Sequence, residues 1–407
     1  MMTIPLRIPR RARWNNFGGD SPFIPYGRQS IDENDIDAVV QVLKSDWLTT
    51  GPSVEEFENA FASFVGARCA VAVSSGTAAL HTAMSAVGIG PGDQVVVPPL
   101  TFAATANAVV YQGGHPIFAD IDSKTLLLNP EAAEECVSNR TRALVAVDYA
   151  GQPCDYDALR AIADRHGLVL IADACHSLGA EYRGKKTGTF ADVSVFSFHP
   201  VKHITTGEGG MITTDDPALA ARMRRFRNHG IDTDHRQRAE SGTWHYEMVD
   251  LGYNYRLNDI SCALGTSQLR RLPETLARRR EIASAYDRAF SGLASLCIPE
   301  NAPFVRHAYH LYPVRYQAAR TGGDRGNFFR LLREQGIGAN VHYLPVHLHP
   351  YYQKRYGYRR GDYPVAEAAY DELISLPLFP AMTDGERDRV IEGVRRALVL
   401  DSQRNRV

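Results

Sequence analysis

The sequence predicts a two-domain α/β fold, with a large domain built on a mainly parallel sheet covered by helices and a smaller C-terminal α+β domain. Three observations predict it. The chain has 407 residues, which is too long for one compact core. Up to about residue 265, short runs that are apolar throughout alternate with helical stretches. Beyond that point a strand is mixed with several helices, which suits a smaller domain packed on the first.

The chain is expected to begin with an arm and two amphipathic helices. Residues 1–24 are basic, proline-containing and terminal, so we expect them to form an N-terminal arm. Apolar residues recur at helical spacing over residues 32–45 and 53–65. Ser53 is a plausible N-cap for the second helix.

The alternating region supplies the expected sheet. Its apolar runs are CAVAVSS, QVVVPP, ALVAVDY, LVLIAD, SVFSF and GGMITT. Helices are expected after the first three runs, from Thr77, from about Phe102 and from Tyr156. Apolar strands separated by helices indicate a mainly parallel sheet that is covered on both faces.

The last third begins with a long charged helix, expected over residues 266–290 with a break or kink at Pro273. A strand near HLYPVRY, a helix near GNFFRLLREQG and a closing helix from Thr383 follow. The expected boundaries are therefore 25–275 for the large domain and 276–407 for the small domain.

Composition argues against several classes of protein. The formal net charge is −1, so no global basic field points to nucleic acid or to an anionic membrane. No run approaches the ~20 apolar residues of a membrane span, and no apolar stretch follows the basic N-terminus, so we expect neither an anchor nor a secretory signal. The six cysteines form no CxxC pair and are expected to be reduced thiols in a cytoplasmic protein.

Two segments could hold a phosphorylated aromatic ring. Ser74-Ser75-Gly76-Thr77 lies between a strand and a helix, and the free N–H groups of a helix N-terminus suit a phosphate. An ordinary helix cap would have the same sequence. Asp173 ends a buried strand, where it either caps a turn or keeps a pyridinium nitrogen protonated. His176, three residues on, could hydrogen-bond a phenolic oxygen of such a ring.

The most informative stretch is SFHPVKHITTGEGG, residues 197–210, which contains Lys202. A lone lysine is usually a surface residue, but in a partly desolvated pocket its amine loses its proton more easily and becomes a nucleophile. The glycines that follow let the backbone pass close to a bulky cofactor. A phosphate loop, an Asp at a strand end and a Lys about thirty residues later form the arrangement that a pyridoxal-phosphate (PLP) site needs.

Seven motifs together make the sequence resemble the DegT/DnrJ/EryC1/StrS family of PLP-dependent nucleotide-sugar aminotransferases. They are WLTTGP at 47–52, SSGTAAL at 74–80, TFAATANAV at 101–109, ADACHSLGA at 172–180, SFHPVKHITTGEGG at 197–210, GYNYRLNDI at 252–260 and ISLPLFP at 374–380. The likeness runs from about Pro25 to about Leu398. It implies a fold-type-I aminotransferase that is active as a homodimer.

The resemblance also implies a role for each matching residue around the cofactor ring. Lys202 is the Schiff-base lysine, and Asp173 pairs with the pyridine nitrogen. His176 faces the ring oxygen, where relatives carry Gln or His. Phe102 matches the aromatic residue that stacks on the ring.

The phosphate is expected to be held by residues of two subunits. Gly76, Thr77 and Ser197 match the phosphate-binding positions of the family, and Asn254 matches an Asn that reaches the phosphate from the other subunit. The active site is then at the subunit interface, and a monomer should be inactive.

A narrower likeness points to one branch of the family. DYAGQP at 148–153, the Lys202 segment and NVHYLPVH at 340–347 are similar to the pseudaminic-acid-pathway branch. That branch aminates C4 of a UDP-linked 4-keto-6-deoxy-N-acetyl sugar with L-glutamate as donor, for surface polysaccharide or nonulosonic acid biosynthesis. The residues that match its substrate contacts are Tyr26, Asp46, Trp47, Leu48, Thr49, Asn340, Val341, His342 and Tyr343.

Three alternatives stay open beside this interpretation. Another sugar 3- or 4-aminotransferase of the family would share the same motifs. A sugar dehydratase of the family would carry His in place of the lysine; His203 adjoins Lys202, but Lys202 lies five residues after Ser197 and five before Gly207, as in the aminotransferases. A PLP-binding regulator without turnover is the third. No metal is expected, because His347 and His349 have no third ligand at a suitable spacing.

Overall fold

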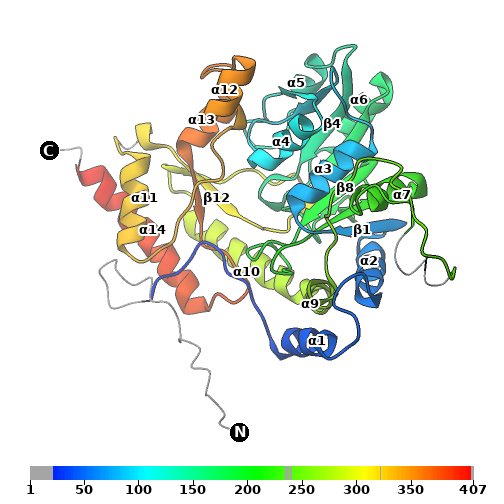
Figure 1. The fold of residues 1–407 in the computed structure, drawn as a ribbon. Helices are drawn as coiled ribbons and strands as arrows, with labels where there is room; N and C mark the ends of the chain where they lie inside the picture. The colour runs from blue at the N-terminus through cyan, green and yellow to red at the C-terminus, as the bar shows by residue number, and fades with distance from the viewer. Residues whose placement is uncertain (1–21, 234–237, 239–240, 321, 405–407) are drawn as a thin grey trace, which may run out of the picture.

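A computed structural model describes residues 22–233, 238, 241–320 and 322–404 (Figure 1). Most of the arm expected over residues 1–24 therefore lies outside the described residues. Figure 1 shows the large sheet on the right, next to the elements of the last third of the chain on the left.

The large domain is built on a seven-stranded sheet with the order β1-β9-β8-β5-β4-β2-β3. Its strands are β1 (Cys69–Val73), β2 (Gln94–Val97), β3 (His115–Phe118), β4 (Thr141–Val147), β5 (Val169–Asp173), β8 (Val193–Ser197) and β9 (Gly210–Thr214). Strands β3, β2, β4, β5 and β8 pair in parallel, whereas β9 pairs antiparallel with both β1 and β8. The expected mainly parallel sheet is confirmed, and its antiparallel pairings both come from β9.

Alternation along the strands gives the sheet two buried faces. Val71 and Val73 of β1 belong to one hydrophobic cluster, and Ala70 and Ala72 belong to another. Successive side chains of a strand point to opposite faces, so a strand that is apolar throughout needs cover on both sides.

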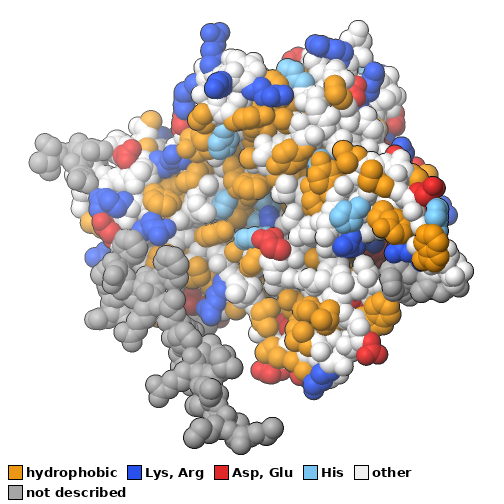
Figure 2. All heavy atoms as spheres, viewed as in Figure 1, with side chains coloured by type: hydrophobic (Ala, Val, Ile, Leu, Met, Phe, Trp, Pro, Cys, Tyr) orange, Lys and Arg blue, Asp and Glu red, His pale blue; other side chains and the backbone are white. Residues whose placement is uncertain are grey.

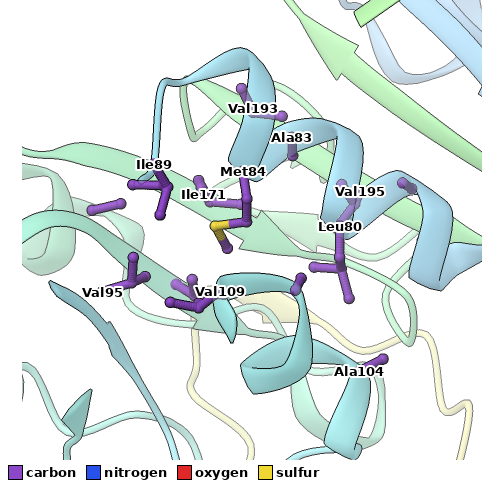
Figure 3. Close-up of a cluster of buried hydrophobic side chains, with 14 of the residues drawn as sticks. Leu80, Ala83, Met84, Ile89, Val95, Ala104, Val109, Ile171, Val193 and Val195 are labelled. Atoms are coloured by element: carbon purple, nitrogen blue, oxygen red, sulfur yellow. The ribbon is translucent and has the colours of Figure 1, made fainter. Parts of the chain in front are cut away.

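Helices from different parts of the chain provide this cover. One face packs against α3 (Gly76–Ala86), α4 (Ala103–Tyr111) and α7 (Pro217–Phe226). Figure 3 shows Leu80 and Met84 of α3 gathered with Ile171, Val193 and Val195 of the sheet. The other face packs against α2 (Pro52–Val65), α5 (Pro130–Glu135), α6 (Tyr156–His166), α9 (Asp259–Arg270) and the start of α10 (Leu272–Phe290).

The smaller domain has its own sheet and its own core. The sheet has the order β10-β12-β13. Its elements are β10 (Leu296–Cys297), β12 (Tyr312–Tyr316), β13 (Leu373–Leu376), α11 (Arg325–Glu334), α12 (Pro350–Tyr356), α13 (Pro364–Glu372) and α14 (Asp384–Arg404). Ile24 is fully buried in this core and forms a parallel bridge with Ile337, so the chain passes by the small domain before it enters the large one.

Short elements complete the fold. They are α1 (Glu33–Leu43), the strands β6 (Glu181–Tyr182), β7 (Lys185–Lys186) and β11 (Val305–Arg306) of a third sheet, and the 3-10 turns η1 (Tyr149–Gly151), η2 (Ala318–Arg320) and η3 (Val346–Leu348).

The structure corrects one expected helix boundary and confirms a break. Helix α2 begins at Pro52 with Gly51 as its N-cap, and Ser53 lies inside it, so the expected Ser53 cap is wrong. The Ser53 N–H donates instead to Asp259 Oδ1 at 3.0 Å. Pro suits the first helical position, and a distant carboxylate supplies the acceptor that a local cap would give. The long charged helix is interrupted at Arg271, just before Pro273, as expected.

Candidate active site

The predicted cofactor residues gather at one edge of the large sheet. Asp173 ends β5 and Ser197 ends β8, and these two strands are parallel neighbours. Gly76 begins α3 directly after β1, which runs in the same direction because β9 is antiparallel to both β1 and β8. Ligands of open α/β sheets bind outside the carboxyl ends of the strands, and this is that edge.

The start of α3 is the part of the site that is expected to hold the phosphate. Ser75 is its N-cap and accepts from the Ala78 N–H at 3.0 Å. A Cβ added to Gly76 would lie 2.8 Å from the Cβ of Ser197, so the helix start and Ser197 can approach only because this residue is Gly. Free N–H groups, the Ser197 hydroxyl and the positive end of the helix dipole thus face the same region, next to Thr77.

Asp173 is a buried carboxylate with hydrogen bonds on both oxygens. Its side chain is 6% exposed. The Thr105 hydroxyl donates to Oδ2 at 2.8 Å, and the Cys175 N–H donates to Oδ1 at 3.3 Å. The Thr101 hydroxyl lies 2.7 Å from that of Thr105. These hydrogen bonds fix the carboxylate in place at the end of β5, where it suits a protonated ring nitrogen.

Sequence reasoning missed Thr101 and Thr105 as supports of Asp173. Thr105 lies in the first turn of α4 and Thr101 just before that helix, so their spacing along the chain carries no signal of a contact with the distant Asp173. Together they tie the start of α4 to the end of β5.

Lys202 lies in the turn that follows β8, with a half-buried side chain. Its backbone N–H donates to the His199 carbonyl at 2.9 Å, which shapes the turn. Burial lowers the pKa of the Lys202 amine, while the nearby Asp173 carboxylate opposes that shift. A lowered pKa leaves more of the neutral amine, which is the nucleophilic form.

His176 lies between Lys202 and the small domain, and its side chain is 6% exposed. Burial first, and then the charge of Lys202, hold the pKa of His176 well below its ordinary value. Its Nε2 lies 3.1 Å from the hydroxyl of Tyr343, and within the described residues its buried Nδ1 has no hydrogen-bond partner. Sequence reasoning missed His310, whose ring lies 4.3 Å from that of His176, centroid to centroid.

Phe102 is the predicted ring-stacking residue. It is the N-cap residue of α4, and its side chain is 59% exposed, although Phe is a poor capping residue. Its ring lies 5.8 Å from that of Tyr343. A large exposed aromatic side chain at this position suits stacking on a planar ligand.

These residues fit PLP. Gly76 lets the start of α3 lie close to Ser197, where backbone N–H groups can bind a phosphate. The Asp173 carboxylate suits the ring nitrogen, and the exposed Phe102 side chain suits a face of the ring. Nδ1 of His176 is buried and has no hydrogen-bond partner among the described residues, so a bound ligand could supply one.

Part of the predicted substrate set lies close to this site. The ring of Tyr26 is 5.3 Å from that of His342, and Tyr343 contacts His176. Asn340, which precedes Val341, forms an antiparallel bridge with Ser375 of β13. The 340–343 segment is therefore carried by the small domain and faces the edge of the large sheet.

The other predicted residues, Asn254 and Asp46–Thr49, belong to two neighbouring segments of the chain. Both are exposed. The segments touch, because the Asp259 N–H at the start of α9 donates to the Leu48 carbonyl at 3.1 Å. The Ser74 N–H donates to the Tyr255 carbonyl at 2.8 Å. The residue after Asn254 is therefore hydrogen-bonded to the loop of residues 74–77, which is expected to bind the phosphate.

Two further findings concern metals and membranes. Among the described residues, no group of three or more His, Cys, Asp or Glu side chains could hold a metal ion. His347 pairs instead with the buried Glu367, at 2.9 Å. None of the described helices is both long and apolar enough to cross a membrane.

Comparison with known proteins agrees with the site. The spore coat polysaccharide biosynthesis protein SpsC of Bacillus subtilis is 44% identical over 375 residues, which cover 92% of this chain and 96% of SpsC. The structure of Helicobacter pylori PseC, an aminotransferase involved in the biosynthesis of pseudoaminic acid, has a TM-score of 0.87 and 32% identity, covering 93% of this chain and 100% of that one. The putative sugar aminotransferase Spr1654 of Streptococcus pneumoniae, in its PMP-form, has a TM-score of 0.87 and 31% identity, covering 93% and 99%.

The fold and the site define a fold-type-I aminotransferase that uses PLP. The model of one family matches residues 29–395. The chain belongs to the DegT/DnrJ/EryC1/StrS aminotransferase family.

Proposed function

We propose that this protein transfers the amino group of L-glutamate to C4 of a nucleotide-linked keto-deoxy sugar, of the UDP-4-keto-6-deoxy-N-acetyl-altrosamine type. The reaction would serve surface-polysaccharide or nonulosonic acid biosynthesis in the cytoplasm. The observation that carries the proposal is the meeting of Lys202, Asp173 and the Gly76–Ser197 contact at one sheet edge.

Each residue has a chemical task in this reaction. Bound PLP supplies a ring that accepts the electrons of the substrate carbon when that carbon loses its proton. The Lys202 amine takes this proton and returns it, first for glutamate and then in the reverse sense for the sugar. Asp173 holds the proton on the ring nitrogen, and Phe102 and His176 hold the ring in one orientation. One lysine serves both half-reactions because both substrates use the same site.

The choice of sugar is supported by the relatives and by the 340–343 segment. PseC is described by its part in pseudoaminic acid biosynthesis, and SpsC by its part in spore coat polysaccharide biosynthesis. Tyr26, His342 and Tyr343 form a cluster next to His176, where they would be able to contact a sugar. Another sugar 3- or 4-aminotransferase activity is the alternative, and a substrate panel separates the two.

L-glutamate should bleach the visible absorbance band of the purified, PLP-loaded protein. PLP held on the Lys202 amine would supply a visible absorbance band, and uptake of the amino group of glutamate would release the lysine and leave the cofactor as the amine, which does not absorb in the visible. The measurement is an absorbance spectrum before and after addition of L-glutamate, with D-glutamate as the matched control. A protein that stays colourless after incubation with PLP would contradict the proposed function.

The same sample then identifies the acceptor. Keto-sugar nucleotides are added one at a time to the bleached protein, after glutamate has been removed. We expect the UDP-4-keto-6-deoxy-N-acetyl sugar to restore the band fastest, with formation of an amino sugar that mass spectrometry detects. Faster restoration by a 3-keto sugar nucleotide would support the alternative.

We also propose that the enzyme is a homodimer with each active site at the subunit interface. Asn254 and Asp46–Thr49 are exposed in the single chain, and their segments are joined by the hydrogen bond from the Asp259 N–H to the Leu48 carbonyl. Several large apolar side chains are exposed in these segments and next to them: Trp47, Leu48, Trp244, Tyr246, Met248, Val249, Leu251 and Tyr253. Figure 2 also shows hydrophobic side chains exposed at the lower end of the molecule, near α1. A second copy that covers this surface would bring Asn254 to the partner's phosphate.

Mixing two inactive variants should restore activity. Lys202→Ala and Asn254→Ala proteins are each expected to be strongly impaired as homodimers. When the two are co-expressed with different tags, about half of the dimers are mixed, and one of the two sites in each mixed dimer then has both Lys202 and Asn254 intact. The measurement is the turnover of doubly tagged, purified dimers.

The control is the co-expression of Lys202→Ala with Asp173→Ala. Both residues belong to the same chain's site, so each mixed dimer contains two damaged sites and stays inactive. If the Lys202→Ala and Asn254→Ala mixture also stays inactive while the mixed dimer forms, Asn254 acts within its own chain and the interface proposal is wrong.

A further inference from the structure

Tyr343 makes a hydrogen bond whose role the proposed function does not explain. Its hydroxyl lies 3.1 Å from Nε2 of His176, and the two ring centroids are 6.0 Å apart. Because Nδ1 of His176 has no partner within the described residues, the Tyr343 hydroxyl is the one polar contact there that orients the imidazole ring. The other close neighbour, His310, packs ring against ring.

Tyr343 is itself held in place from two sides. The preceding carbonyl, that of His342, accepts from the Tyr149 hydroxyl at 2.6 Å. The His342 ring is fixed by Ser375, whose Oγ lies 2.9 Å from Nδ1. On the other side, the Tyr343 ring faces that of Phe102. Tyr343 therefore lies between the residue expected to stack on the cofactor ring and the residue expected to face its oxygen.

The Tyr343 hydroxyl and the His176 imidazole are both neutral at neutral pH. Burial raises the pKa of the Tyr343 hydroxyl well above its ordinary value, and burial lowers the pKa of His176 well below its own. Lys202, His342, His203 and His310 surround the same ring, and the first three lower the pKa of His176 further.

A neutral imidazole carries one proton, on either Nδ1 or Nε2. The nitrogen with the proton donates and the other accepts, and because a hydroxyl can do either, the Tyr343 hydroxyl can pair with Nε2 in both tautomers. It therefore fixes the orientation of the ring and leaves Nδ1 as the nitrogen that can serve a second partner.

We propose that Tyr343 is a positioning residue of the PLP site, whose hydroxyl sets the orientation of His176 and thereby the hydrogen bond between His176 and the cofactor's ring oxygen. The inference rests on the proposed function, since it takes His176 as the residue that faces this oxygen. It gives Tyr343 a task beyond contact with the sugar.

The test is a comparison of Tyr343→Phe, His176→Ala and the double variant. Two quantities are measured without turnover: the dissociation constant of PLP, and the pKa of the visible chromophore from a pH titration of its absorbance. Loss of one hydrogen bond should weaken PLP binding by roughly threefold to tenfold in Tyr343→Phe. The chromophore pKa should move by roughly half a unit or more, in the same direction as in His176→Ala.

The double variant shows whether Tyr343 acts on the cofactor through His176 or independently of it. If Tyr343 acts through His176, the double variant has the chromophore pKa of His176→Ala alone. Tyr351→Phe, at an exposed position of α12, is the matched control and should keep both wild-type values. Circular dichroism checks that every variant keeps its fold.

Three results would overturn the inference. Tyr343→Phe with wild-type values beside an altered His176→Ala would remove any role for the hydroxyl. Additive effects in the double variant would show that Tyr343 acts independently of His176. A wild-type protein that binds no PLP would overturn the proposed function as well, so the two failures are distinguishable.

Discussion

Replacing Lys202 by alanine is expected to abolish amino transfer while the chain keeps its fold. The amine is both the attachment point of the cofactor and the group that moves the proton, so kcat should fall by about 10³-fold or more. Its side chain is half-buried and belongs to none of the hydrophobic clusters, so little stability should be lost. Steady-state turnover, the absorbance spectrum and a thermal melt measure the three parts of this expectation.

Two further variants sharpen the Lys202 prediction. Lys185→Ala, at an exposed lysine of β7, is the matched control and should turn over at the native rate. Lys202→Arg keeps the charge but presents a guanidinium that does not lose its proton, so it should be as inactive as the alanine variant. Native turnover in either Lys202 variant would mean that another group carries the cofactor.

Replacing Asp173 by asparagine should lower kcat by about 10²-fold or more, and the protein should still bind PLP. The amide keeps an acceptor oxygen for Thr105, so the local structure should survive. The substitution removes the negative charge that keeps the ring nitrogen protonated. Removing one electrostatic group of an active site commonly lowers kcat by about 10²-fold or more. The measurement is steady-state kinetics with L-glutamate and the keto sugar.

A chemical rescue distinguishes this role from a structural one. PLP methylated at the ring nitrogen has a fixed positive charge and needs no proton there. It should therefore reduce the difference in kcat between the Asp173→Asn and wild-type proteins. Asp157→Asn, at an exposed carboxylate paired with Arg183, is the matched control and should be unaffected. An Asp173→Asn protein with wild-type kcat would contradict the assignment.

The fold and the centre of the site could be predicted because their signals are local. Apolar runs that alternate with helices indicate a parallel sheet, and Asp173 and Ser197 end such runs. The parts that were missed or wrong depend on contacts between distant segments. The Ser53 cap failed because Asp259 supplies the acceptor, and His310 comes to His176 from beyond the large domain. No spacing rule within one segment contains that information.

Asn254 and Asp46–Thr49 show a different limit. Their motifs mark them as functional, yet these residues are exposed in the single chain. A sequence motif records that a residue is needed, but it does not record in which copy of the chain the residue is used. That question has a physical answer only at the level of the assembly.

The chemistry and the proposed sugar contacts are carried by different parts of the chain. Lys202 and Asp173 are fixed to the edge of the large sheet, whereas Asn340, which opens the 340–343 segment, bridges Ser375 of β13 in the small domain. Substitutions at Asn340 and Val341 can therefore change which acceptor fits while Tyr343 keeps its contact with His176. Such a division favours evolutionary divergence, because new specificities can arise by small steps from an enzyme that remains active throughout.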